Sequence, residues 1–115
     1  MTTAVEVAEK GHQLAAWVNF NGTLDENSGS LTVGENVLIR ASYNVSSIYY
    51  NGTGDYTVNF TTAMPDANYS LVGTVIYSRT IFGINSLTEI SARVSTYDEG
   101  VGYYNSNPIC VAIFR

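Results

Sequence analysis

The stretch that decides the fold is Ser42–Tyr69, which reads SYNVSSIYYNGTGDYTVNFTTAMPDANY. Strand-forming residues lead up to the turn Asn51–Gly54 and resume directly after it, over Asp55–Thr61. The turn combines an Asn-Gly pair, which tolerates a positive φ at little cost, with a second glycine that can close a bulge. This stretch therefore predicts a β-hairpin.

The strand after the turn has the alternation of a half-buried β-strand. Tyr56, Val58 and Phe60 fall on one face, and polar residues fall between them on the other. The segment Met64–Asp66 then ends the ladder, because Pro65 has no amide proton to donate. We predict that the hairpin is followed by a turn into a third strand.

The chain from Ala16 onward reads throughout as short strands separated by glycine, proline and asparagine. Its 115 residues fit one domain, which we place at residues 16–115; residues 1–15 are expected to be a tail or the end of a stalk. The predicted fold is all-β, a compact antiparallel β-sandwich of jelly-roll-like type. Ile90, Ala92 and Val94 are expected to share one face of a strand, opposite Ser91, Arg93 and Ser95. The expected strands are Ala16–Asn21, Asn36–Ala41, Tyr43–Tyr50, Asp55–Thr61, Tyr69–Ser78, Thr88–Tyr97 and Pro108–Phe114.

The final strand is apolar on both faces. Ile109, Val111 and Ile113 share one face, while Phe114 and the residues between them make the other face apolar as well. This pattern is typical of a strand that is covered on both sides. We expect one side to face the domain's own core and the other a neighbouring subunit of a homotrimer, with Cys110 a buried, inert thiol.

The charge balance disfavours two classes of partner. Lys and Arg total 5 against 10 Asp and Glu, which gives a formal net charge of −5. Nucleic-acid binding needs a basic surface, and anionic membranes attract basic segments, so neither partner is expected. No apolar run approaches the roughly 20 residues that span a bilayer, and the first residues lack the features of a signal peptide. The single cysteine cannot form a disulfide within the chain, which is consistent with folding in a reducing compartment.

The sequence offers little for catalysis. The one histidine, His12, lies in the N-terminal segment, without a partner nucleophile and without the ligand cluster that zinc requires. The acidic pairs Asp25-Glu26 and Asp98-Glu99 lie in Gly- or Ser-flanked loops, where carboxylates are usually solvated. Calcium binding at the second pair is an alternative, but no motif supports it. We therefore expect no enzymatic activity, no cofactor and no metal.

Aromatic and polar residues gather in two segments expected to be loops, Tyr77–Asn85 and Tyr97–Asn107. Sugar sites are built from such residues, because an aromatic ring stacks on the pyranose while Asp, Asn and Arg bind its hydroxyls. The competing interpretation is that these aromatic residues pack against a neighbouring subunit. The candidate ligand-binding residues are Tyr97, Asp98, Tyr103, Tyr104, Asn105, Tyr77 and Arg79.

Three blocks of the chain resemble a module found near the C-termini of bacteriophage tail-fibre proteins. They are AWVNFNG at Ala16–Gly22, IRASYNVSSI at Ile39–Ile48 and NGTGDYTVNFTTAMPDANY at Asn51–Tyr69. The resemblance extends to Thr74. This chain departs from the module in an extra acidic segment, Leu24–Asn36, and again after Val75.

The resemblance implies a distal, trimeric domain of a virion fibre or capsid appendage, made in the cytoplasm of the bacterial host. Its expected partners are further copies of itself, the rest of the fibre on the N-terminal side, and a carbohydrate on the host surface. The expected function is host attachment by non-catalytic glycan binding. The alternative is a structural role, as a trimerising cap or a capsid decoration that binds no ligand.

Overall fold

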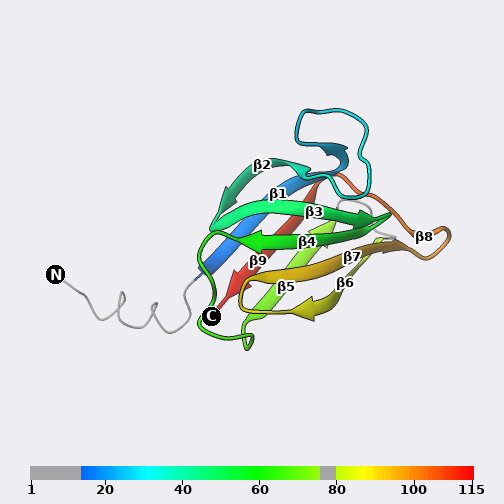
Figure 1. Cartoon of the computed structure of the whole chain (residues 1–115). Helices are drawn as coiled ribbons and strands as arrows, with labels where there is room; N and C mark the ends of the chain where they lie inside the picture. Colours follow the sequence, from blue (N-terminus) through cyan, green and yellow to red (C-terminus); the bar gives the residue numbers. More distant parts are fainter. Residues whose placement is uncertain (1–13, 76–79) are drawn as a thin grey trace.

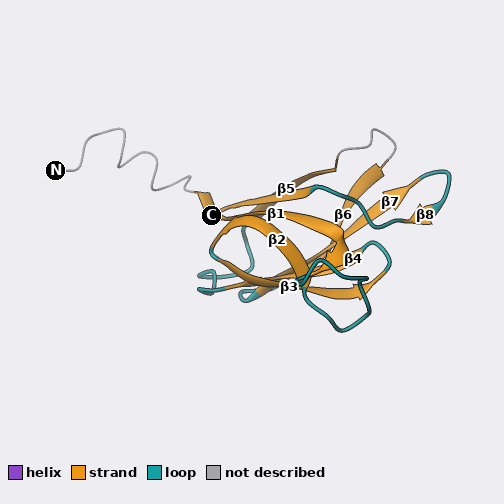
Figure 2. Ribbon diagram, turned by 90° about the horizontal axis from the view of Figure 1, so that it is seen from above, coloured by secondary structure: helices purple, strands orange, loops and turns teal. Residues whose placement is uncertain are grey.

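The computed structural model describes residues 14–75 and 80–115, which form a sandwich of two antiparallel sheets (Figures 1 and 2). Sheet I has the strand order β2-β1-β9-β5, and sheet II has the order β3-β4-β7-β6, with the short β8 paired to β7. The described residues contain strands and no helix. This confirms the predicted all-β antiparallel sandwich; the trimer and the stalk stay predictions. The strands are β1 Leu14–Asp25, β2 Val37–Tyr43, β3 Val45–Gly52, β4 Asp55–Phe60, β5 Ser70–Val75, β6 Thr80–Leu87, β7 Ser91–Asp98, β8 Gly102–Tyr103 and β9 Ile109–Phe114.

The predicted hairpin is present as β3 and β4. Tyr50 pairs with Tyr56, and a register shift follows before Gly52 pairs with Asp55, as expected for a bulge beside the turn. Gly54 has a φ of 65°, in the left-handed region that glycine enters without strain. The hairpin therefore closes in the way its glycines predict.

The core lies between the two sheets and is built from alternate residues of the strands. Tyr56, Val58 and Phe60 of β4 are buried, as the alternation predicts. The ring of Tyr56 packs edge-to-face on Phe20 of sheet I, with the centroids 5.3 Å apart. On β9, Ile109 and its alternate neighbours face the same core.

Asn44 ties the two sheets together where the chain passes from β2 to β3. It has a φ of 55°, a conformation that asparagine tolerates better than most residues. Its Nδ2 donates to the carbonyl oxygens of Ala15 and Thr62, both 3.1 Å away, and its Oδ1 accepts the Thr62 N–H at 2.7 Å. One side chain thus fixes the corner of the sandwich.

Two sequence-based predictions fail in sheet II. Tyr77–Asn85 was expected to be a loop, but β6 begins at Thr80 and pairs with β7 along its length. The glycine, asparagine and serine of this segment suggest a loop. The strand is held in place by packing, because the ring of Phe82 lies so close to Gly73 that a Cβ there would be 2.3 Å from it. Ile90 was expected to share a strand face with Ala92 and Val94, but it precedes β7 and is 66% exposed, whereas those two residues are buried.

The remaining strand predictions differ from the structure mainly at their ends. The first strand is longer than expected because β1 continues from Leu14 to Asp25. Cys110 is half-buried and Phe114 is 40% exposed in the single chain, so the outward face of β9 is not covered by the domain itself. The predicted tail or stalk at the N-terminus lies almost entirely outside the described residues. Within the described part of the chain, no helix is long and apolar enough to cross a membrane.

Candidate functional site

An exposed pair of aromatic rings lies on the hairpin formed by β7 and β8. Tyr97 pairs across the strands with Tyr103, and their rings meet edge-to-face with centroids 5.5 Å apart. Tyr97 is 38% exposed and Tyr103 is 58% exposed. Figures 1 and 2 show β8 at the end of the sandwich opposite the C-terminus. We call this pair of rings the tyrosine tip.

The backbone next to the tip is held by the β3–β4 turn. The Thr96 N–H donates to the Gly54 carbonyl at 2.8 Å, and the Tyr104 N–H donates to the Thr96 carbonyl at 3.2 Å. The Thr96 hydroxyl in turn donates to the Tyr104 carbonyl. Thr96 is fully buried, so these hydrogen bonds are shielded from water and connect the tip to the sandwich.

Asn105 anchors the segment that follows the tip. Its Oδ1 accepts the Gly54 N–H at 2.7 Å and lies 3.0 Å from the Tyr56 hydroxyl, while its Nδ2 donates to the Tyr50 hydroxyl at 2.9 Å. Because an asparagine amide offers two acceptor and two donor positions, most of its capacity is used inside the protein. Asn105 therefore holds the segment that follows the tip against the β3–β4 hairpin.

Tyr56 joins the same network to sheet I. Its hydroxyl lies 2.7 Å from the Gly22 carbonyl oxygen, and the Gly22 N–H donates to the Ser106 carbonyl at 2.9 Å. A Cβ on Gly22 would lie 2.4 Å from that hydroxyl, so the close approach requires glycine. Burial raises the pKa of Tyr56 far above its ordinary value, which keeps the phenol protonated and able to donate.

The structure brings four of the seven predicted site residues to one end of the molecule. Tyr97, Asp98 and Tyr103 lie on the β7–β8 hairpin, and Tyr104, 42% exposed, directly follows it. Asn105 is adjacent in the sequence, but its amide is directed to the interior contacts described above. The other two predicted residues, Tyr77 and Arg79, lie outside the described residues.

The acidic pairs shape turns. The Asp98 Oδ1 accepts the Gly100 N–H at 2.9 Å within the tip hairpin. The Asp25 Oδ1 accepts the N–H groups of Asn27 and Gly29, both at 2.8 Å. Over residues 14–75 and 80–115, no group of three or more potential metal-ligating side chains comes together.

Sequence reasoning missed a second polar site beside the tip end of β3. A hollow of about 290 Å³ lies between the loop that follows β1 and the exposed ring of Tyr49. The Tyr50 N–H donates to the Glu35 carbonyl at 3.0 Å, which fixes the loop over the strand. The sequence signal was the extra acidic segment Leu24–Asn36, but nothing in it indicated which strand it covers. The hollow is lined by Asp25, Glu26, Asn27, Gly34, Glu35, Asn36 and Tyr49.

Comparisons of this chain with protein-family models, with curated proteins and with solved structures found no match. The family resemblance of the sequence therefore stays a proposal.

Proposed function

We propose that this chain is the distal domain of a bacteriophage fibre or capsid appendage, and that it attaches to the host by binding a surface glycan without transforming it. The observation that carries the proposal is the tyrosine tip. Tyr97 and Tyr103 stay exposed on a hairpin that is hydrogen-bonded to the sandwich, at the end remote from the C-terminus, where a receptor-binding surface would be free to approach a cell. The attachment to a phage virion rests on the sequence resemblance.

The geometry of the tip suits a sugar. An aromatic ring offers a flat apolar face to the C–H side of a pyranose, and two rings set edge-to-face hold each other in place. The hydroxyls of the exposed Tyr97 and Tyr103 supply hydrogen-bonding groups for the sugar hydroxyls. A shallow site of this kind has a low affinity for a single sugar. Several copies on one virion would raise the overall affinity through avidity.

A purely structural role is the second candidate, and one observation favours it. Aromatic side chains also lie exposed on the outward side of sheet I, where Tyr43 is 52% exposed and Phe114 is 40% exposed. A cap or decoration would use such residues for assembly and need no ligand. The two roles are compatible, since the residues concerned lie on different parts of the molecule.

The proposal is tested by presenting the fluorescently labelled, multivalent domain to an array of bacterial surface polysaccharides. We expect binding to a subset of glycans, an approximately tenfold loss with Tyr103→Ala, and retention with Tyr103→Phe, which keeps the stacking ring. Tyr49→Ala is the matched control, because Tyr49 is similarly exposed, at 42%, in the polar hollow. Absence of binding by the parent domain, or loss only with Tyr49→Ala, would overturn the proposal for the tyrosine tip.

A further inference from the structure

The turn that joins the two rings of the tyrosine tip carries two adjacent acidic residues, Asp98 and Glu99. The Val101 N–H donates to the Asp98 carbonyl at 3.0 Å, which closes the turn around Glu99, and the Glu99 side chain is exposed. Glu99 is two residues from Tyr97, so their Cα atoms are at most about 7 Å apart. This is less than the distance of about 8 Å over which physiological salt screens a charge. A ligand stacked on Tyr97 therefore lies within the field of Glu99.

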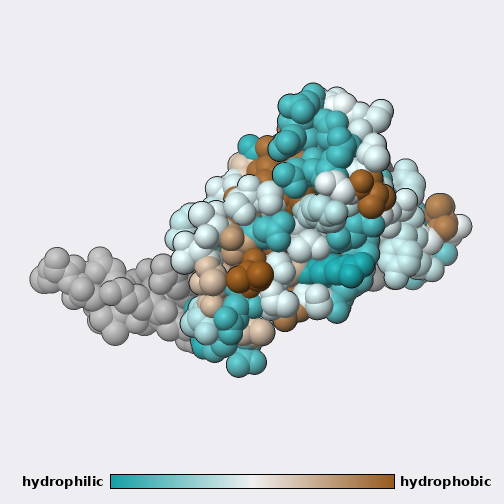
Figure 3. Space-filling model, in the orientation of Figure 1, coloured by the Kyte–Doolittle hydropathy of each residue, from teal (hydrophilic) through white to brown (hydrophobic). Residues whose placement is uncertain are grey.

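The loop at the same end of the sandwich is acidic as well. Asp25, Glu26 and Glu35 line the polar hollow that this loop forms. The loop is hydrogen-bonded to Tyr50, and the turn that follows Tyr50 is hydrogen-bonded to Thr96 beside the tip. Figure 3 shows hydrophilic residues over this loop, which Figure 1 places in the same orientation. The tip is therefore presented by an acidic end of the molecule.

The arginines of the described part of the chain do not offset this charge. They are Arg40, Arg93 and Arg115. Arg93 binds Asp55 through two nitrogens, with N–O distances of 2.9 and 2.6 Å. Arg115 binds Asp66 in the same way, with distances of 3.0 and 2.7 Å. Arg40 lies on β2, in the sheet that does not carry the tip. These cations are thus paired with carboxylates or lie on the other sheet.

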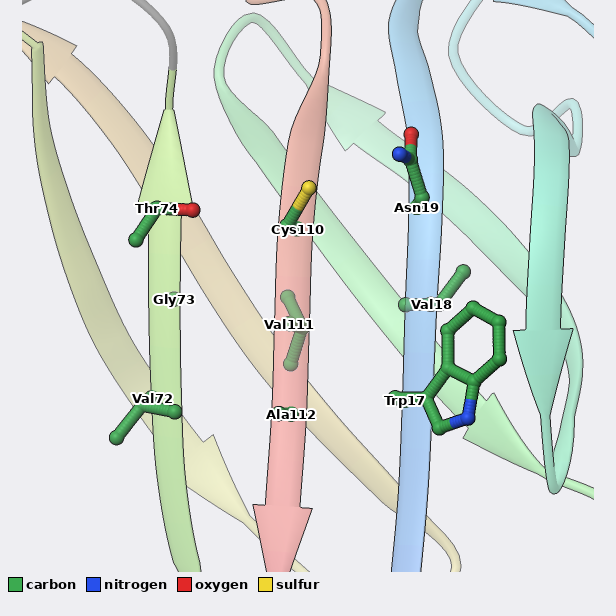
Figure 4. Close-up of a pocket in the computed structure, with 9 residues that line it drawn as sticks. All are labelled: Trp17, Val18, Asn19, Val72, Gly73, Thr74, Cys110, Val111 and Ala112. Carbon is green, nitrogen blue, oxygen red and sulfur yellow. The ribbon is translucent and has the colours of Figure 1, made fainter.

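A second hollow, on the outward side of sheet I, is uncharged. It has a volume of about 320 Å³, and Figure 4 shows Trp17 on one side of it and Val72 on the other, with the small Ala112 between them. All the residues that line it are uncharged. It lies in the sheet that does not carry the tip, so a glycan bound there would not meet Glu99. Selection of a ligand by charge is therefore a property of the tip and not of this hollow.

We propose that the tyrosine tip binds glycans that carry no carboxylate or phosphate group, and that Glu99 determines this specificity. The proposal rests on the proposed function, glycan binding at the tip. An uncharged sugar stacks its C–H face on the rings and is not repelled by Glu99. A sugar with a uronic acid or a phosphate brings a like charge into the same space, and such a juxtaposition discriminates against a ligand.

The net charge of the whole chain acts in the same direction. At −5 it repels a polyanionic chain from a distance and slows its association. Salt screens this long-range repulsion, whereas Glu99 acts within the screening length. The local and the overall contribution can therefore be separated by placing the same charge change at the tip or far from it.

The first experiment presents the labelled, multivalent domain to uncharged and to acidic bacterial polysaccharides. We expect binding to uncharged ones alone, with little dependence on salt and an approximately tenfold loss with Tyr103→Ala. Trp17 is the single tryptophan and lines the sheet I hollow, so its emission should not change when the glycan is added. Binding of acidic polysaccharides that is lost with Tyr103→Ala would overturn this inference and leave the proposed function standing. Absence of all glycan binding, or a change in Trp17 emission together with full binding by Tyr103→Ala, would overturn both.

The second experiment reverses the charge at the tip. Glu99→Lys should raise binding to acidic polysaccharides about tenfold and leave binding to uncharged ones within about twofold. Glu89→Lys is the matched control, because Glu89 is also exposed and lies just before β7, whose other end carries the tip. Arg79, a cation outside the described residues, is tested by Arg79→Gln, which should retain the preference for uncharged glycans. Equal gains with Glu99→Lys and Glu89→Lys, or loss of the preference with Arg79→Gln, would contradict the role of Glu99.

Discussion

The side chain of Asn105 accepts a hydrogen bond from the backbone N–H of Gly54, 2.7 Å away, across a sequence separation of 51 residues. This contact joins the segment after the tyrosine tip to the β3–β4 turn. The same side chain reaches the hydroxyls of Tyr50 and Tyr56, so three elements meet at one amide. The position of the tip is therefore set by residues that do not themselves face the candidate ligand.

Asn105→Ala should lower the free energy of unfolding by about 1–3 kcal/mol, because it leaves buried polar partners without a hydrogen bond. Urea unfolding measures this change. Asn68→Ala is the control, because Asn68 is exposed and its backbone N–H, which the substitution leaves in place, donates to the Asp66 Oδ1 at 2.9 Å. Equal stability of the two variants would show that the Asn105 network is not important for the fold.

Gly54→Ala should be more destabilising than Gly102→Ala, although both glycines have a positive φ. A Cβ on Gly54 would lie 2.5 Å from the Thr96 carbonyl oxygen, whereas a Cβ on Gly102 would meet nothing within 4 Å. Backbone strain costs about 1 kcal/mol or more in both variants, and only Gly54→Ala adds a steric clash. Gly54→Val should be less stable than Gly54→Ala. We expect it to lower the free energy of unfolding by roughly 1–3 kcal/mol relative to the parent. Thermal unfolding of the variants measures this order of stability. The prediction would be contradicted if Gly102→Ala had the lowest melting temperature.

Acid should weaken the fold partly through Asp55. The hydrogen bonds from Arg93 hold the pKa of the Asp55 carboxyl below its ordinary value of 3.8. A carboxyl whose pKa is lowered on folding stabilises the native state above its ordinary pKa, and this contribution is lost as the pH falls through the lower, folded value. Asp55→Asn should therefore reduce the melting temperature at neutral pH, and the difference from the parent should shrink toward low pH.

Arg93→Gln tests the cause of that effect, because it removes the partner and keeps the carboxylate. It should reproduce the pH dependence of Asp55→Asn. Arg115→Gln is the control at a second two-pronged ion pair, Arg115 with Asp66, where the carboxyl side chain is 35% exposed against 21% for Asp55. Solvent screens that pair, so a smaller change is expected. If the difference in melting temperature between the parent and Arg93→Gln stayed constant at all pH values, the assignment of the Asp55 pKa shift to Arg93 would be contradicted.

The hairpin could be predicted because its information is local. Asn51–Gly54 supplies the turn and the alternation around Tyr56 supplies the buried face, so neighbouring residues suffice to specify β3 and β4. Strand β6 could not be predicted from the sequence, because Gly83 and the polar residues near it resemble a loop. Its place is fixed by pairing with β7 and by the packing of Phe82 on Gly73.

The residues of the candidate site could be predicted from the sequence, but their arrangement in space could not. An exposed tyrosine on a glycine-containing hairpin can be inferred from Tyr97–Asn107 alone, and Tyr103 is such a residue. The structural role of Asn105 could not be inferred, because its partners lie on distant segments. The polar hollow was missed for the same reason, since Tyr49 becomes part of it only when the loop carrying Glu35 closes over β3.

The measurement that tests the central claim most directly is nuclear magnetic resonance mapping of a bound glycan. The ¹⁵N-labelled domain would be titrated with the polysaccharide fragment that the array identifies. The proposed function predicts that the largest shifts occur at the amides of Tyr97 and Tyr103 and that the protons of their rings show contacts to the sugar. Shifts centred on Tyr49 and the polar hollow, or no shifts at the tyrosine tip at saturating glycan, would contradict it.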